Sequence, residues 1–521
     1  MIRNLGHTAK FGDGLYFLNI GDKGDFAARV FLDDFVNFSG DPNLNTRTKA
    51  RKAIGGVKAE WQNDRDPSTK EHSLFGVASQ VVALTHIYQA LDWDYAVHTA
   101  ISLIDKGAGL DWLWKRKHWM VDEYQDFNQA EQRLLASAVA RADSVVIVGD
   151  DYQSLYRSRG GAPEGLLALY SDTDGNDAVS LVCCRRCPSE IVTKANKLAE
   201  SMPGETRELL SSRDGGKVGC AHFASARQEI LSLADFLKKQ VSAMGEQPKP
   251  EERTACLFPN RRMRDFYFER LSDAGVPCVK PPTPSEARQV LTIALRLSQE
   301  RGQRFAERVL LEKASGIPRD KREVIVRRLW SEQKAITTFL PALLESSELS
   351  AVKPAGVAWL ASIAQIVSGQ APELATGLTQ LTGFAVGVEQ AQEFLANVDD
   401  ENLEDAIQTF CDTVTGDPAE GAGEGSEKSV DFLTIHASKG LTRKCVVLPG
   451  LEQIHFPGSS KGEELEEKRR MFYVALTRAT ERVIITFPRM RHSGDCLRRP
   501  GAGQYQPSGF IKEAGITINK K

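Results

Sequence analysis

Two short segments of the chain combine apolar residues with acids and amides in a way that suits phosphate chemistry. Residues 119–123 read WMVDE, and residues 145–153 read VVIVGDDYQ. Asp122, at the carboxyl end of a predicted buried strand, can hold Mg²⁺ against nucleotide phosphates. Glu123 beside it can orient and deprotonate an attacking water, and Gln153 can hydrogen-bond a γ-phosphate. Together these residues predict the core of a nucleotide-driven motor.

The residues around these two segments predict a parallel α/β arrangement. Residues 119–123 and 145–149 are predicted to be parallel core strands, with a crossover helix at 128–142 between them. Asn128 suits the N-cap of this helix, because its short polar side chain can accept a hydrogen bond from a backbone N–H group of the first turn. The resulting βαβ unit leaves the polar residues of both segments at the carboxyl ends of its strands.

Composition and charge limit the class of protein. Apolar residues make up 41% and charged residues 26% of the 521 residues, as expected for a soluble globular protein of several domains. The net charge of −3 is not typical of a nucleic-acid binder, so affinity for DNA has to come from local basic clusters such as Arg185–Arg186. No apolar run could span a bilayer and no secretory signal opens the chain, so we expect a cytoplasmic protein with no membrane partner.

Five segments resemble, in the same order, motifs of the UvrD/Rep-like superfamily 1 helicases. They are MVDEYQD (120–126), VVIVGDDYQSLYRSRGGA (145–162), LVCCRRCPSEI (181–191), LTIHASKGL (433–441) and EKRRMFYVALTRATERVIIT (467–486). Five motifs in order are far more specific than any one of them, since a DE pair at a strand end arises by chance in many proteins. The resemblance implies an α/β fold of the P-loop NTPase type, with two recombinase-like parallel-sheet motor lobes and a mainly helical insertion in the second.

The resemblance also implies an activity. It is that of an ATP-dependent DNA helicase or translocase that moves 3′ to 5′ on single-stranded DNA, in repair, recombination or defence. The implied cofactors are ATP and Mg²⁺. The implied partner is single-stranded DNA or duplex DNA with a 3′ tail.

On this basis the chain divides into five parts. They are a truncated first lobe at 1–177, with a remnant of a helical insertion at about 1–90; the first part of the second lobe at 178–284; a helical insertion at 285–412; a flexible linker at 413–429; and the second part of the second lobe at 430–521. Within the second lobe, residues 253–278 are predicted to form a strand, a turn, a helix and a strand, and further strands are predicted at 431–435 and 445–449.

One part of such motors has no counterpart in this sequence. They hold the β- and γ-phosphates on a G-x-x-x-x-G-K-[ST] loop, the Walker A motif, and no such string occurs in the 521 residues. The glycine-rich segments 11–25 and 436–441 lack its spacing and its Lys-Ser/Thr end. Residues 2–9 faintly resemble the DNA-contacting segment that follows the loop in the family. We therefore expect a chain that starts just after the loop, through truncation, through loss of the loop or as one half of a split motor.

The resemblance assigns a nucleotide-binding role to four further residues. Arg478 comes at the end of a predicted amphipathic helix, 466–479. It would be an arginine finger, because planar guanidinium donors stabilise the charge on the γ-phosphoryl oxygens. Such a finger is typically worth about 10³-fold or more in rate. Arg186 would be a second cation on the same phosphate, and Lys439 and Gly440 would open a helix beside the nucleotide. The alternative for either arginine is a helix-surface residue paired with a glutamate.

Five residues are assigned to DNA contacts in the same way. Thr434, His436 and Ser438 lie in a segment that couples DNA to nucleotide in the family, and the last two can contact a DNA phosphate. Tyr156 stands where an aromatic ring stacks on a base, which is worth about 1–3 kcal/mol per base. The second aromatic usual at this place is a serine here, although Arg159 can still contact a phosphate or lie over a base. Packing in the core is the alternative for Tyr156 and His436.

The cysteines offer one alternative chemistry. The chain has nine cysteines and no signal peptide, which indicates reduced cytosolic thiols. Cys183, Cys184 and Cys187 form a C-C-x-x-C cluster that could suggest zinc or an iron–sulfur centre. A fourth ligand at suitable spacing is not evident, and the cluster falls on the fourth helicase-like motif. The one metal that we expect is Mg²⁺ at Asp122.

The sequence is compatible with three functions. The first is the ATP-dependent helicase. The second is a catalytically impaired DNA- or partner-binding relic, or one half of a split motor whose partner chain supplies the phosphate loop. The third is a subunit coupled to a nuclease, which would be a separate partner because no nuclease-like acidic and lysine residues gather after residue 486. If the first lobe is incomplete, an edge of its sheet is uncovered, and reduced stability or association is expected.

Overall fold

The computed structural model describes most of the chain. The described residues are 16–20, 25–107, 111–157, 160–173, 177–203, 207–281, 286–299, 303–314, 316–346, 352–368, 377, 407, 428–491 and 505–520. Three predictions fall outside them: the resemblance at 2–9, the role of Arg159 and nearly all of the linker at 413–429. Among the described residues, no helix is long and apolar enough to cross a membrane.

The chain forms two compact units, each assembled from segments far apart in the sequence. The first unit comprises residues 1–121, 127–147 and 283–416, and the second comprises residues 122–126, 148–282 and 417–521. The acidic segment 122–126 therefore belongs to the unit that also contains most of the second motif and all of the third, fourth and fifth motifs.

The first unit is mainly helical. Its described helices are α2 (Phe26–Ser39), α3 (Arg47–Gln62), α4 (Phe75–Tyr88), α5 (Trp93–Asp105), α6 (Asp111–Trp114), α7 (Gln129–Val139), α12 (Glu286–Gln299), α13 (Arg304–Glu312), α14 (Arg319–Glu332), α15 (Ile336–Leu344) and α16 (Pro354–Ser368), with a 3₁₀ turn η1 (Pro42–Leu44). The insertion predicted to be helical at 285–412 contains helices α12 to α16 between residues 286 and 368.

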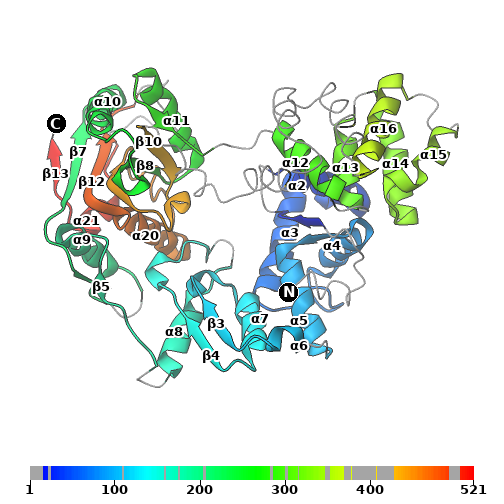
Figure 1. The fold of residues 1–521 in the computed structure, drawn as a ribbon, viewed down its shortest axis with the longest axis horizontal. Helices are drawn as coiled ribbons and strands as arrows, with labels where there is room; N and C mark the ends of the chain where they lie inside the picture. The colour runs from blue at the N-terminus through cyan, green and yellow to red at the C-terminus, as the bar shows by residue number, and fades with distance from the viewer. Residues whose placement is uncertain are drawn as a thin grey trace. The chain divides into compact units, whose positions relative to one another are not determined.

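Helices from the insertion and from the beginning of the chain share one core. Helices α12 and α13 pack against α2, and Figure 1 shows these green and blue segments side by side. The Phe305 ring contacts the rings of Phe31 and Tyr88, with centroids 6.0 and 5.2 Å apart. Within this core, Arg308 Nη2 lies 2.8 Å from Asp34 Oδ1, and the Tyr88 hydroxyl donates to Asp34. A buried carboxylate is tolerated here because it is fully paired.

Two short parallel sheets complete the first unit. Strand β1 (Tyr16–Leu18) pairs with β2 (Ala90–Asp92), and β3 (His118–Val121) pairs with β4 (Ser144–Ile147). Helix α7 connects β3 to β4. Its N-cap is Asn128, whose side chain accepts from the Glu131 N–H at 2.9 Å while Glu131 accepts from the Asn128 N–H. The predicted βαβ unit and its cap are therefore confirmed.

The burial predicted for these two strands is wrong for all of their residues except Val121. Met120 on β3 is 85% exposed and Val146 on β4 is 49% exposed. In the described part of the chain, β3 and β4 pair only with each other, so no further strand covers either edge. Asp122 consequently follows a strand that is largely exposed and not buried.

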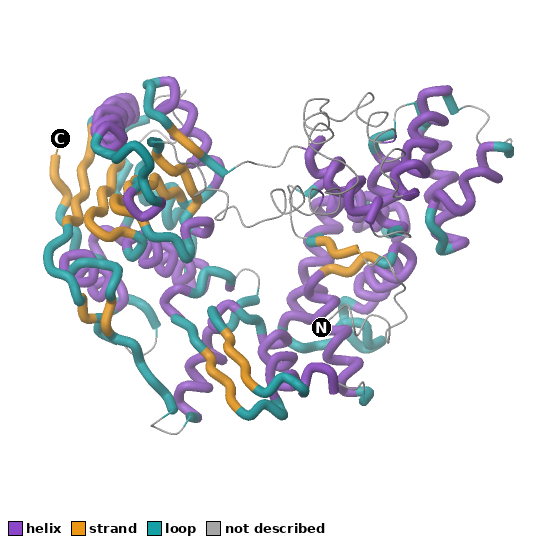
Figure 2. Tube along the Cα trace, viewed as in Figure 1, coloured by secondary structure: helices purple, strands orange, loops and turns teal. Residues whose placement is uncertain are grey.

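The second unit is built on a seven-stranded parallel sheet. Its order is β13-β7-β12-β11-β8-β10-β9, and Figure 2 shows these strands in orange. The strands are β7 (Lys217–Phe223), β8 (Thr254–Phe258), β9 (Cys278–Val279), β10 (Val430–Thr434), β11 (Arg443–Leu448), β12 (Ala479–Pro488) and β13 (Ile518–Lys520). A separate pair consists of β5 (Cys183–Cys184) and β6 (Leu210–Ser211). The strands predicted at 253–278, 431–435 and 445–449 are confirmed within two residues.

Helices cover both faces of this sheet. They are α9 (Ser189–Ala199), α20 (Gly462–Leu476) and α21 (Gly509–Glu513) on one face, and α10 (Ala226–Ser242) and α11 (Arg261–Asp273) on the other, with α8 (Pro163–Asp172) and the 3₁₀ turn η5 (Pro250–Glu252) outside these layers. On β8, Ala255 and Leu257 pack with the first set, whereas Cys256 and Phe258 pack with the second. Because both faces of the sheet are covered, every residue of β8 is buried.

Candidate nucleotide site

Gln125 joins two acidic segments of the second unit, residues 122–126 and residues 148–153. Its side chain is fully buried, its Oε1 accepts from the Asp150 N–H at 3.0 Å, and its Nε2 donates to the Glu123 carboxylate. Glu123 has a φ of +54° and precedes the 3₁₀ turn η2 (Tyr124–Asp126). A left-handed conformation is unusual for a residue other than glycine, and such strain concentrates at functional sites. The predicted catalytic carboxylate is thus held in a defined position.

The second acidic segment can lie close to the Gln125 side chain because residue 149 is a glycine. A Cβ atom at Gly149 would lie 2.5 Å from Gln125 Oε1 and 2.8 Å from Leu166 Cδ2. Beyond it, Asp150 caps the 3₁₀ turn η3 (Asp151–Gln153), and Gln153 Nε2 donates to Asp150 Oδ2 at 2.7 Å. The amide of Gln153 is therefore oriented by a contact within the protein itself.

Lys439 lies between two of the carboxylates. Its Nζ is 3.0 Å from Glu123 Oε2 and forms a second ion pair with Asp126. Burial lowers the pKa of Lys439, but the hydrogen bonds and charges of Asp126 and Glu123 outweigh it and the pKa is raised overall. Burial in turn raises the pKa of Asp126, which the contact with Lys439 opposes. Lys439 is consequently a cation that balances the acidic segment.

The predicted helix at Lys439 and Gly440 is not formed. A single 3₁₀ turn, η7 (His436–Ser438), follows β10, and the chain then turns into β11. Gly440 has a φ of +80°, a left-handed conformation that ends the turn and that glycine adopts without strain.

Arg478 is bonded to the predicted γ-phosphate sensor. Its Nη2 donates to Gln153 Oε1 at 2.7 Å and its Nε donates to the Val474 carbonyl at 3.1 Å. The residue lies just past the end of α20 and is only 2% exposed. Burial, together with the charge of Arg186, lowers its pKa to about 10, so it stays protonated at neutral pH. A helix-surface arginine paired with a glutamate, the alternative considered for it, does not describe this residue.

Arg186 lies near Arg478. Its Nη1 donates to the Thr477 carbonyl at 3.4 Å, and Thr477 directly precedes Arg478. In the part of the chain that the structure describes, neither arginine forms an ion pair with a carboxylate. Two neighbouring cations without such partners favour a bound anion, and guanidinium groups suit phosphate oxygens.

Asp122 fits the role predicted for it as a magnesium ligand. It is exposed, and its Oδ1 accepts from the Glu123 N–H at 2.8 Å. Within the described ranges, no three His, Cys, Asp or Glu side chains gather as a metal cage. Mg²⁺ in nucleotide sites usually takes only one or two protein carboxylates, with phosphate oxygens and water completing its octahedron. A single exposed aspartate beside the other site residues is compatible with that arrangement.

The structure brings together only some of the residues predicted to contact DNA. The ring centroids of Tyr156 and His436 are 6.2 Å apart, and Lys439 Nζ lies 5.6 Å from the Tyr156 centroid. Tyr156 is half-buried and absent from the hydrophobic core, so core packing alone does not account for it. Ser438, in contrast, is buried and its hydroxyl donates to the Ile435 carbonyl at 2.8 Å, while Thr434 accepts from a backbone N–H. The hydroxyl of Ser438 is thus engaged within the turn.

Three residues of the site had no predicted role. They are Gln125, Asp126 and Asp150, which contact the Glu123 carboxylate, the Lys439 ammonium group and the Gln153 amide respectively. The clustering of acids and amides in DEYQD and GDDYQ was the available signal, but the sequence does not show which of these side chains point inward.

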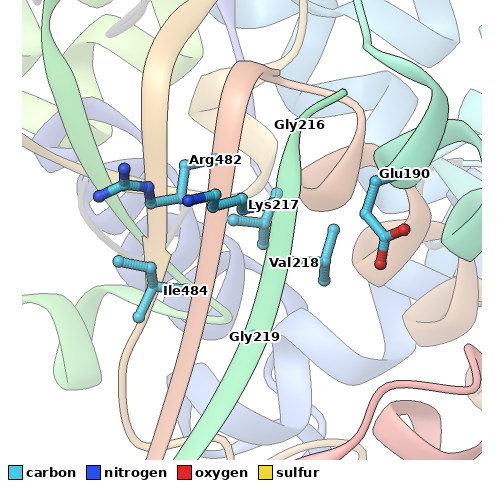
Figure 3. Close-up of a pocket in the computed structure, with 8 residues that line it drawn as sticks. Glu190, Gly216, Lys217, Val218, Gly219, Arg482 and Ile484 are labelled. Atoms are coloured by element: carbon cyan, nitrogen blue, oxygen red, sulfur yellow. The ribbon is translucent and has the colours of Figure 1, made fainter. Parts of the chain in front are cut away.

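A pocket elsewhere in the second unit contains none of the candidate residues. Its lining includes Gly216, Lys217 and Gly219 on or before β7, Arg482 on β12 and Glu190 on α9 (Figure 3). Lys217 and Arg482 face each other in the pairing of β7 with β12. This pocket plays no part in the site described above.

Comparison with known proteins gives two matching family models. Residues 40–174 match the UvrD/REP helicase N-terminal domain, and residues 363–489 match the UvrD-like helicase C-terminal domain. The chain is 25% identical over 430 residues to DNA helicase II of Escherichia coli (strain K12), which covers 76% of this chain and 58% of that protein. It is 24% identical over 509 residues to the ATP-dependent DNA helicase PcrA of Staphylococcus epidermidis, which covers 88% of this chain and 67% of that protein.

These matches agree with the parallel-sheet fold and with the five motifs, which occur in the order of the family and contain the candidate site residues. They define the class as proteins built from UvrD-like helicase N-terminal and C-terminal domains. Within this class, the chain belongs to the UvrD/Rep-like family of superfamily 1 helicases. The chain spans less than two thirds of the length of the DNA helicase II sequences that it matches.

Proposed function

We propose that this protein is an ATP-dependent DNA helicase or translocase that moves 3′ to 5′ along single-stranded DNA, in DNA repair, recombination or defence. The observation that carries the proposal is the hydrogen bond between Arg478 and Gln153, which are 325 residues apart in sequence. It joins the fifth helicase-like motif to the second at the place where a γ-phosphate would be recognised. The direction of movement rests on the family resemblance alone.

The catalytic roles follow from the chemistry of the side chains. Mg²⁺, held by Asp122 and the phosphates, would neutralise charge on the nucleotide. Glu123 would accept a proton from the attacking water, and its contact with Gln125 keeps its carboxylate in place. Arg478 and Arg186 would stabilise the negative charge that spreads over the γ-phosphoryl oxygens, because both are cations without carboxylate partners among the described residues.

The DNA contacts would connect to this chemistry through Lys439. Tyr156 and His436 would contact the strand, by stacking on a base and by bonding a phosphate respectively. Lys439 lies over the Tyr156 ring and pairs with Glu123, so a movement of either aromatic residue on DNA binding reaches the catalytic carboxylate. This link offers a physical basis for ATP hydrolysis that responds to DNA.

The decisive experiment is ATP hydrolysis by the purified chain with and without single-stranded DNA. We expect turnover that DNA stimulates and that Glu123→Gln abolishes. The matched control is Glu323→Gln, an exposed glutamate on α14 outside the site, which should leave turnover unchanged. Turnover that persists in Glu123→Gln would overturn the assignment of the catalytic base.

A second candidate function is distinguished by the same assay. The absence of a G-x-x-x-x-G-K-[ST] string from the 521 residues is the observation that favours a DNA- or partner-binding protein without its own turnover, or one half of a split motor. Absence of hydrolysis with retained binding to single-stranded DNA would support it. Recovery of hydrolysis on addition of a chain that carries a phosphate-binding loop would then identify the split motor.

A further inference from the structure

Cys184 and Cys187 face each other across a tight turn. The Cys187 N–H lies 3.4 Å from Cys184 Sγ, and the Arg186 N–H also points to this sulfur. The Cys187 thiol is next to Cys184 and 3.3 Å from the Thr477 carbonyl, to one of which it can donate its single proton. Cys184 is half-buried and Cys187 is buried. A partly exposed thiol, able to attack, and a shielded second thiol thus lie beside each other in the same turn.

The surroundings of the two sulfurs differ in electrostatics. The hydrogen bond from Cys187, backbone N–H groups and the Arg186 charge outweigh burial and lower the pKa of the Cys184 thiol to about 5. The hydrogen bond with Cys184 and burial raise the pKa of the Cys187 thiol. Convergent N–H groups form an anion-binding concavity, and thiolates in Cys-x-x-Cys turns are stabilised in this way. Cys184 therefore has the character of a nucleophile at neutral pH.

We propose that Cys184 and Cys187 are a redox modification site that forms a reversible intramolecular disulfide with a low-molecular-weight disulfide of the glutathione type as oxidant. The Cys184 thiolate attacks one sulfur of the oxidant, which breaks the oxidant's S–S bond, forms a mixed disulfide and releases one thiolate. Cys187 then loses its proton to solvent and attacks the Cys184 sulfur, which releases the second thiolate. Two protein thiols are oxidised, and one small disulfide is reduced to two thiols.

The turn contacts the residue before the proposed arginine finger. The Arg186 guanidinium donates to the Thr477 carbonyl, the Cys187 sulfur lies 3.3 Å from the same oxygen, and Arg478 follows directly. The disulfide removes the S–H donor of Cys187 and draws its sulfur towards Cys184. The structure therefore assigns to oxidation a loss of ATP turnover, a consequence that rests on the proposed function, whereas formation of the disulfide does not.

The first experiment detects the bond itself. The full chain is incubated with oxidised glutathione, its remaining thiols are alkylated, and the peptide that contains residues 184–187 is examined by mass spectrometry. We expect a Cys184–Cys187 disulfide that dithiothreitol reverses. Cys187→Ser should stop at a glutathione adduct on Cys184, and Cys184→Ser should give neither product. Cys183→Ser, an exposed neighbour, should behave as the unchanged chain.

Several outcomes would overturn the proposal. They are the absence of any disulfide in the unchanged chain, a disulfide that uses Cys183, or an adduct that forms equally in Cys184→Ser. Cys183 and Cys184 are not buried, so Cys183→Ser and Cys184→Ser decide the question even if Cys187→Ser does not fold.

A second experiment separates this site from the proposed function. ATP turnover is measured for reduced and oxidised chain, with Cys184→Ser under the same treatment. We expect oxidation to lower turnover at least tenfold in the unchanged chain and not in Cys184→Ser. A disulfide that forms without any change in turnover would overturn the link to Arg478, and a chain without turnover in either state would count against the proposed function while the disulfide result still stands.

Discussion

The Nζ of Lys439 lies 3.0 Å from Oε2 of Glu123, although the two residues are 316 positions apart in the sequence. The same lysine pairs with Asp126 and lies over the Tyr156 ring. The proposed catalytic carboxylate and the proposed DNA-stacking ring therefore share one cation, and a change at this cation should affect both.

Lys439→Met should uncouple hydrolysis from DNA. We expect the stimulation of ATP turnover by single-stranded DNA to be lost, because the cation that links Tyr156 to Glu123 is gone. The free energy of unfolding should fall by about 1–3 kcal/mol, since Asp126 loses its buried partner. Lys444→Met removes an exposed lysine that is 3.7 Å from Glu481, and it should change neither quantity. Full DNA stimulation in Lys439→Met would contradict the shared-cation interpretation.

Arg478→Ala should lower kcat by about 10³-fold or more, because the charge on the γ-phosphoryl group loses its buried cation. Arg478→Lys keeps the charge but not the planar donors that bond Gln153, and we expect an intermediate loss. KM for ATP should change less than kcat if the contact is made mainly in the transition state. The control is Arg489→Lys, because Arg489 is an exposed residue directly after β12. Its steady-state kinetics should match those of the unchanged chain.

Gly149→Ala should disorder the acidic segments. The new Cβ would meet Gln125 Oε1 at 2.5 Å, so the hydrogen bonds from Gln125 to Glu123 and Asp150 cannot all persist. We expect a loss of about 1–3 kcal/mol in stability, together with most of the turnover. Gly55→Ala, where no atom lies within 4 Å of the new Cβ in helix α3, should instead stabilise by about 0.5–1 kcal/mol. Urea unfolding of both variants gives the comparison.

Glu452 should make stability depend on pH. It is fully buried and paired with Arg491 at 2.7 Å, and burial raises its pKa to about 7 against the opposing charge of Arg491. Because the folded state holds the proton more tightly than the unfolded state, this group stabilises below the unfolded pKa of about 4.5, and that contribution is lost as pH rises to about 7. The loss is on the order of a few kcal/mol.

The difference between the unchanged chain and Glu452→Gln isolates this effect. A glutamine cannot titrate, so urea unfolding of the variant should vary less between pH 5 and pH 7.5 than that of the unchanged chain. An equal pH dependence for both proteins would rule out Glu452 as its source.

The uncovered strands β3 and β4 should promote self-association. Met120 and Val146 are exposed apolar side chains on strands with unpaired edges among the described residues. We expect sedimentation to show association that grows with concentration at the micromolar level and that Met120→Gln with Val146→Thr reduces. The change in stability should stay within about 0.5 kcal/mol per substitution, since neither side chain is buried. A monodisperse monomer that melts cooperatively would contradict this prediction.

Local patterns in the sequence predicted several of the helices and strands, although the helix predicted at Lys439 and Gly440 is not formed. The run at 253–278 predicted β8, α11 and β9, and Asn128 predicted the cap of α7, because both depend on the periodicity of apolar residues and on neighbours a few positions away. The ordered motifs also identified the family. Each of these signals lies within a short segment, so it does not depend on how the rest of the chain folds.

Only the tertiary structure decided which side chains meet. The pairs Lys439 with Glu123, Arg478 with Gln153 and Arg308 with Asp34 each join residues hundreds of positions apart. No local pattern records such a contact, because it depends on which faces of distant elements pack together. For the same reason the sequence predicted buried strands at 119–123 and 145–149, since apolar residues show what a strand could bury but not whether another element covers it.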